Sequence, residues 1–264
     1  MALQQQPGAG GSVLRALRVV EAVAAAGDGV TAKAIARRLG CPLPTIYRVL
    51  GTLVEQGYLV RLHDVRGYGL GYQIAHLHRS LVDQVLPPAA VRMIVQEVHA
   101  TARAATYLFV FRDLDIVVAH LENCAEHPGL PGMRAGEPAS PHSTAGGKAL
   151  LAGLDAARLG AVLAESGLPR ITRRTVSDRR ALDRELMRVR SAGVAVEVEE
   201  HQRGFAGVAA PVRGPGGETT GALGVSVSRA EFTARRWELE DAVRSGATRL
   251  VRTLAVTPGA ALAP

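Results

Sequence analysis

The chain has 264 residues, of which 47% are hydrophobic, enough for two domains with separate cores. No apolar run approaches the roughly 18 residues that span a bilayer, and residues 1–11 lack the pattern of a signal peptide. The two cysteines, Cys41 and Cys124, lie far apart and offer neither a disulfide framework nor a zinc-ligand set. We therefore expect a cytoplasmic protein with no membrane segment, metal or other cofactor.

Positive charge is concentrated at one end of the chain. The net charge is +7, and residues 1–80 hold nine basic and four acidic residues, a local charge of +5. The other 184 residues contribute only +2. Codon bias toward arginine is an alternative explanation for the total, but it does not account for the concentration. The pattern favours an acidic partner for the N-terminal part.

Three short helices are predicted in the N-terminal part, after a disordered arm at 1–11. Ser12 is the candidate cap of the first, which runs to about 26, and glycines at 27 and 29 end it. Thr31 opens a second helix that Gly40 ends, and a proline-containing turn leads into a third helix at 44–56. The inward positions are expected to include Val13, Leu14, Leu17, Val20, Val23 and Ala24 in the first helix, and Ile46, Val49, Leu50, Leu53 and Val54 in the third.

This arrangement predicts a winged helix-turn-helix domain over 12–71. Two short helices around a glycine turn form the motif, and the exposed face of the second would enter the DNA major groove. Strand-like runs at 58–62 and 68–70 around a polar turn would form the wing. The candidate DNA contacts are Thr45, Tyr47, Arg48 and Thr52 on the helix and Arg61 and Arg66 on the wing. A plain three-helix bundle with a solvated polar face is the alternative.

The rest of the chain predicts a linker helix at 72–86, a second domain at 87–254 and a disordered tail at 255–264. Strand-like runs at 107–111, 116–121, 194–199, 206–213 and 221–228 are mixed with helical segments at 143–152, 155–166, 178–192 and 231–254. Strand pairs mixed with helices favour an α+β fold with a largely antiparallel sheet.

Several separate blocks in this sequence resemble the IclR family of bacterial transcriptional regulators. In the N-terminal part they are 16–20, 34–40, 45–50, 53–59 and 68–71; in the second part they are 141–152, 168–175, 189–195, 199–201, 204–205 and 209–212. The blocks occur in family order from about 12 to 254. The resemblance implies a winged helix-turn-helix joined by a linker helix to a GAF-like domain with an effector pocket on one side of its sheet.

The resemblance also suggests where an effector would bind. The matching positions are Ala145, Gly146, Glu197, Gly207, Ser226 and Ser228. The N–H groups where a helix begins suit an anion, and two hydroxyls two residues apart on a strand share a face. No basic cluster for a phosphorylated ligand is evident, so we expect a small organic acid or aromatic metabolite. The alternatives are a solvated strand face for the two serines and a surface position for Glu197.

Two segments of the sequence resemble enzyme motifs but do not match them. The glycines before Lys148 lack the GxxxxGK[ST] spacing of a phosphate loop, and His142-Ser143 lies outside any GxSxG pattern. We expect a non-enzymatic regulator that binds a palindromic operator in double-stranded DNA as a homodimer or homotetramer and responds to a small-molecule effector. A DNA-binding protein without a ligand, and an enzyme fused to a DNA-binding module, are the other two hypotheses.

Overall fold

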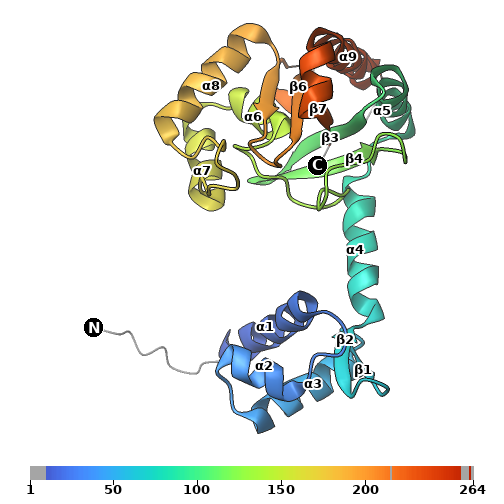
Figure 1. Cartoon of the computed structure of the whole chain (residues 1–264), viewed down its shortest axis with the longest axis vertical. Helices are drawn as coiled ribbons and strands as arrows, with labels where there is room; N and C mark the ends of the chain where they lie inside the picture. The colour runs from blue at the N-terminus through green and yellow to red at the C-terminus, as the bar shows by residue number, and fades with distance from the viewer. Residues whose placement is uncertain (1–9, 215, 257–261, 263–264) are drawn as a thin grey trace. The chain divides into compact units, whose positions relative to one another are not determined.

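The computed structural model describes residues 10–214, 216–256 and 262, and the chain forms two compact units that divide between Leu81 and Val82 (Figure 1). Residues 1–9 of the expected arm, and 257–261 and 263–264 of the expected tail, lie outside the described residues. The described remainder of both segments is structured. Helix α1 already includes Gly10 and Gly11, and Leu262 is only 3% exposed, packed into the core of the second unit.

The first unit is the predicted winged helix-turn-helix. It consists of α1 (Gly10–Ala26), α2 (Ala32–Leu39), α3 (Leu43–Glu55), β1 (Leu59–Leu62) and β2 (Gly67–Leu70). The Thr31 hydroxyl accepts the Ala34 N–H at the start of α2, as its position before the helix predicted. Gly40 ends α2 with φ +62, a left-handed conformation that glycine adopts without a steric cost.

The core of the first unit is formed by the three helices and the wing. Ile35, Ile46 and Leu50 are fully buried in it. The prediction for α1 was partly wrong, because its buried face is made by Val19, Ala22 and Val23 while Val13, Leu14, Leu17 and Ala24 are exposed. The wing strands pair antiparallel, and Val30 forms a further bridge to Tyr68 that fixes the wing to the segment before α2.

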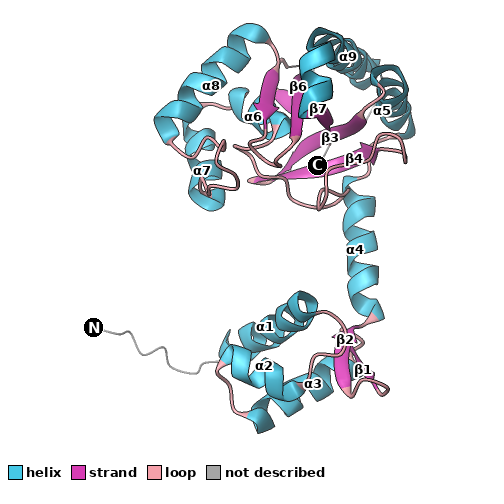
Figure 2. Cartoon of the chain, in the orientation of Figure 1, coloured by secondary structure: helices cyan, strands magenta, loops and turns pink. Residues whose placement is uncertain are grey.

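The second unit is a five-stranded antiparallel sheet with helices on both faces (Figure 2). The sheet order is β4-β3-β7-β6-β5. Helix α4 (Tyr72–Val85) contains the division between the units. The remaining elements are α5 (Ala89–Ala102), β3 (Ala105–Arg112), β4 (Asp115–Glu122), α6 (Ala145–Ala152), α7 (Ala156–Ser166), α8 (Arg179–Ala192), β5 (Ala195–Val198), β6 (Phe205–Arg213), β7 (Thr219–Ser228) and α9 (Arg229–Val256).

Alternate residues of the strands feed two cores. One lies between the sheet and α5 and α9, and includes Leu108, Val208 and Leu223; the other lies between the sheet and α6, α7 and α8, and includes Tyr107 and Phe109. This confirms the predicted α+β class and antiparallel sheet. Among the described residues no helix is both long and apolar enough to cross a membrane.

Candidate DNA-binding surface and effector cavity

Helix α3 presents a polar face to solvent. Tyr47 is 55% exposed, Arg48 and Thr52 are also exposed, and Thr45 is half-buried at the start of the helix. The Thr52 hydroxyl donates to the Arg48 carbonyl within the helix at 3.3 Å. The apolar side of α3 is held in the core by Ile46, Leu50 and Leu53, so the polar face is fixed outward.

The wing adds two exposed arginines to this surface. Arg61 lies on β1, and Arg66 lies in the turn between the strands with φ +50. A left-handed conformation is uncommon for a residue with a side chain, and the turn is closed by the Arg66 N–H donating to the His63 carbonyl. Both guanidinium groups are free to reach a phosphate backbone.

A small cavity lies between the sheet and the start of α6. It is lined by aromatic and apolar side chains and by five of the six predicted effector residues: Tyr107, Phe109, Leu130, Met133, Thr144, Ala145, Gly146, Glu197, Gly207, Gly224, Val225 and Ser226. Its volume of about 20 Å³ holds roughly one water molecule. Ala145, Gly146 and Gly207 bring backbone close to this space, and a side chain at Gly146 would overlap the Phe109 ring.

Two buried polar side chains face this cavity, a hydroxyl without a partner and a carboxyl held by the backbone. The Ser226 hydroxyl is buried and has no hydrogen-bond partner in the described structure. Glu197 is 2% exposed, and its Oε2 accepts the Glu200 N–H at 3.1 Å. Burial raises the pKa of Glu197 to about 7, although the hydrogen bond from the Glu200 backbone opposes this shift. Glu197 is thus a buried acid, and the alternative of a surface position is wrong.

Ser228 does not line the cavity. The two-residue spacing placed it beside Ser226, but it is exposed at the end of β7, and its Oγ accepts the Glu231 N–H at 3.1 Å. It therefore caps the first turn of α9. Ser228 is the last residue of β7: it still pairs with Phe205 of β6, but the pairing of β7 with β3 stops at Ser226, and Ser228 is exposed.

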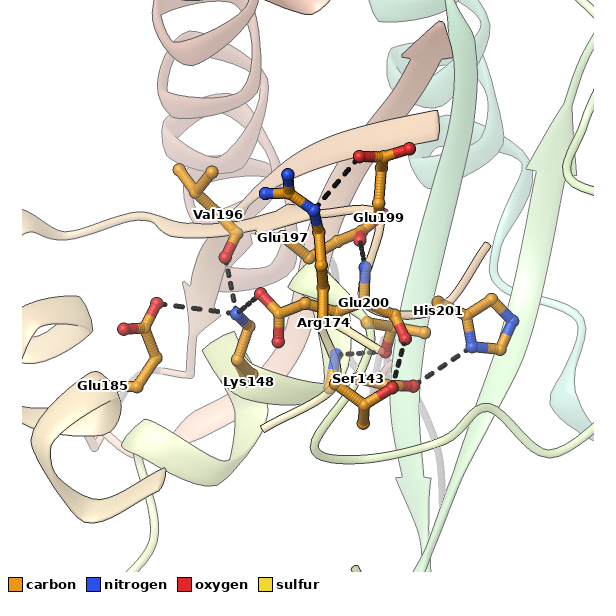
Figure 3. A network of polar contacts seen from close by, with 12 residues as sticks. Ser143, Lys148, Arg174, Glu185, Val196, Glu197, Glu199, Glu200 and His201 are labelled. Carbon is orange, nitrogen blue, oxygen red and sulfur yellow. Dashed lines mark hydrogen bonds and ion pairs between the residues drawn. The ribbon is translucent and has the colours of Figure 1, made fainter. Parts of the chain in front are cut away.

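Lys148 forms a buried ionic network that the sequence did not reveal (Figure 3). Its side chain is 0% exposed, and its Nζ donates to Glu200 Oε1 at 2.7 Å and to the Val196 carbonyl at 2.6 Å. Glu185 on α8 lies 3.5 Å away. These contacts join α6, α8 and the segment after β5, so Lys148 holds the elements that carry Glu197 in place.

The serine and histidine next to α6 are also part of the scaffold. His142 Nε2 donates to the Pro169 carbonyl at 2.9 Å, and burial lowers the pKa of its imidazole. Ser143 Oγ lies 3.1 Å from Nδ1 of His201, a pair 58 residues apart in sequence that local patterns could not find (Figure 3). Within the described residues no carboxylate bonds the His201 ring, as a serine–histidine–acid triad requires.

Comparisons with known proteins agree with this architecture. Residues 12–63 match the IclR helix-turn-helix domain, and residues 87–252 match the C-terminal domain of the bacterial transcriptional regulator IclR. The HTH-type transcriptional regulator Rv1719 of Mycobacterium tuberculosis is 31% identical over 88% of this chain and 87% of its own length. BhcR of Paracoccus denitrificans, another HTH-type transcriptional regulator, is 29% identical over 89% of this chain and 84% of its own length.

Solved structures show the same fold. A putative transcriptional regulator from Rhodococcus sp. RHA1 has a TM-score of 0.72 and 26% identity, with 92% of this chain and 98% of that chain covered. An IclR homologue from Microbacterium hydrocarbonoxydans, solved with 4-hydroxybenzoate, has a TM-score of 0.68 and 23% identity, with 93% and 100% covered. With family matches to both units, this chain belongs to the IclR family of helix-turn-helix transcriptional regulators and is not an enzyme.

Proposed function

We propose that this regulator binds an operator in double-stranded DNA through α3 and the wing, and that a small metabolite in the cavity changes its operator affinity. The main support for an effector site is the buried Ser226 hydroxyl. It has no hydrogen-bond partner in the described structure, and it lines a cavity together with the Glu197 carboxyl. Buried polar groups in proteins are nearly always hydrogen-bonded, so this pair is arranged to meet a ligand. Such a regulator acts on the chromosome in the cytoplasm.

The cavity favours a small aromatic or organic-acid effector. Tyr107 and Phe109 are stacked with their ring centroids 5.8 Å apart and form an apolar wall. The N–H groups of Ala145 and Gly146 lie in the first turn of α6, where no carbonyl of the helix accepts them. An oxygen of the ligand would bind these N–H groups, and a hydroxyl would bind Glu197 and Ser226. Because the cavity holds roughly one water molecule, a metabolite can enter only if the side chains that line the cavity rearrange.

The effector is tested by thermal denaturation with aromatic and small organic acids. We use 4-hydroxybenzoate as the first probe, since a similar fold was solved with it. A ligand at a hundred times its Kd stabilises the folded protein by about 2.7 kcal/mol. Ser226→Ala should remove that gain and the ligand's effect on operator binding, whereas the matched control Ser228→Ala, outside the cavity, should retain both. A full response in Ser226→Ala would place the effector elsewhere, and an equal loss in Ser228→Ala would show that the loss is not specific to the cavity.

The DNA contacts are tested by separating base reading from phosphate binding. Arg48→Ala should cost about 1–3 kcal/mol of operator affinity and relax specificity at one position. Arg66→Ala should weaken all sequences alike and lower the salt slope by about one unit. Arg252→Ala, an exposed arginine near the end of α9, is the control for loss of charge. If Arg48→Ala leaves the operator affinity unchanged, the proposal that α3 lies in the major groove is wrong.

We further propose that the chain acts as a homodimer or homotetramer on a palindromic operator. One recognition helix contacts too little DNA for operator specificity, and two-fold proteins read paired half-sites. Exposed apolar side chains on α1 and α4 support such pairing: Val13, Leu14, Leu17, Tyr72 and Leu77. Light scattering at micromolar concentration should find no monomer, and Leu14→Glu with Leu17→Glu should produce one. A wild-type protein that is strictly monomeric would refute the assembly.

A further inference from the structure

Four arginines meet in one groove on the surface of the second unit, although the linear sequence showed no basic cluster there. Arg173, Arg174, Arg203 and Arg229 line this arginine groove together with Thr172 and Glu199. They come from three segments: the loop before α8, the loop after β5 and the first residue of α9. The groove has a volume of about 430 Å³ and shares no lining residue with the effector cavity.

The arginine groove carries more positive charge than its own residues neutralise. Glu199 is the one acid in its lining; its Oε2 forms an ion pair with Arg174 Nε at 3.2 Å and accepts a hydrogen bond from Arg229 Nη1 at 3.0 Å. The Gly204 N–H and then the nearby arginines hold the pKa of Glu199 below its usual range. In the described part of the chain Arg173 and Arg203 form no side-chain hydrogen bond or ion pair. Four guanidinium groups and one carboxylate leave a charge of +3.

The backbone under these arginines is fixed. The Thr172 hydroxyl donates to the Glu199 carbonyl at 2.6 Å, and the Arg229 N–H donates to the Gly204 carbonyl at 2.8 Å. Glu199 has φ +59, and its Oε1 accepts the Gly204 N–H at 3.0 Å. The three segments are thus tied to one another before any ligand arrives, and a ligand need order only the arginine side chains.

We propose that the arginine groove is a second ligand site, which binds a small metabolite through a multiply charged phosphate group. Each guanidinium presents a planar fork of N–H donors that fits two oxygens of a phosphate. Glu199 pairs with one nitrogen each of Arg174 and Arg229, while the guanidinium groups of Arg173 and Arg203 can both bind the ligand. A phosphate has several acceptor oxygens for the guanidinium N–H groups, and its double negative charge would offset most of the +3 charge of the groove.

Isothermal titration of the full-length protein with inorganic pyrophosphate tests the proposal. We expect saturable binding with a Kd below about 1 mM in low salt, weaker as the salt concentration rises. Arg173→Gln with Arg203→Gln should lower the affinity at least about tenfold. The control, Arg134→Gln with Arg252→Gln, removes two exposed arginines outside the groove and should bind like the wild type. Circular dichroism checks that all variants are folded.

A third variant gives a result of the opposite sign. Glu199→Gln keeps an acceptor for the Gly204 N–H but removes the negative charge inside the groove. It should therefore raise the affinity for pyrophosphate several-fold. No binding below about 1 mM would overturn the proposal. An equal loss in the control pair, or weaker binding in Glu199→Gln, would also overturn it, since either result assigns the binding to the overall charge of the protein.

Discussion

Glu197 makes the stability of the second unit depend on pH. Its carboxyl is buried, no cation pairs with it among the described residues, and its pKa is raised to about 7. In the unfolded chain the pKa returns to about 4.3. The folded state therefore binds more protons between these values, so stability is fully present below the unfolded pKa and falls as the pH rises through 7. Integrated from pH 5 to pH 8, the loss is about 2.5 kcal/mol.

Replacing Glu197 with glutamine isolates this contribution. The amide oxygen still accepts the Glu200 N–H but cannot ionise, so Glu197→Gln should gain stability relative to the wild type as the pH rises. Urea unfolding followed by circular dichroism at pH 5, 6, 7 and 8 should show the difference growing by about 2.5 kcal/mol. Titrating groups that do not interact with Glu197 are present in both proteins and cancel in the difference, while Glu200, whose charge helps to raise the pKa of Glu197, belongs to the measured effect.

An exposed glutamate provides the control for this measurement. Glu165 near the end of α7 is exposed, and Glu165→Gln should keep a constant difference from the wild type over the same pH range. A Glu197→Gln difference that stays flat within about 0.5 kcal/mol would refute the reasoning, because the burial of the carboxyl would then carry no cost.

Three further substitutions test the packing of each unit. Lys148→Met leaves Glu200 buried without its cation and should lower stability by about 3–5 kcal/mol in urea unfolding; adding Glu200→Gln should recover most of this, and no recovery would contradict the pairing. Gly146→Ala places a methyl group on the Phe109 ring and should cost about 1–3 kcal/mol; a wild-type thermal midpoint would argue against that contact. Leu50→Ala removes a fully buried side chain of α3 and should cost about 2–5 kcal/mol, measured as a lower midpoint of the first unit and weaker operator binding.

The helix-turn-helix could be predicted from sequence because its signals are local. Thr31 caps α2 and Gly40 ends it, and each acts within four residues of its own position. The buried face of α1 was misjudged because apolar residues cover more than one side of this helix. Periodicity identifies an amphipathic helix, but Leu14 and Leu17 satisfy the same spacing while lying in solvent.

The sites of the second unit could be predicted only in part. The family resemblance gave six positions, of which five line the cavity, but Ser228 is exposed at the end of β7. Strand alternation shows which residues share a face and does not show where the strand ends. The Lys148–Glu200 and Ser143–His201 pairs join residues more than 50 positions apart. The arginine groove likewise forms from segments that only the tertiary fold brings together, so no local pattern could have revealed it.

Because Lys148 is buried, its chemical labelling can measure how often the second unit opens. The chain contains two lysines, Lys33 exposed on α2 and Lys148 enclosed between α6, α8 and the segment after β5. An amine-reactive reagent should modify Lys33 at once, but Lys148 only when the second unit opens. Mass spectrometry of the two peptides then measures the opening rate of one unit, with the other lysine as the internal reference. The same labelling repeated with an effector present would show whether ligand binding closes the second unit.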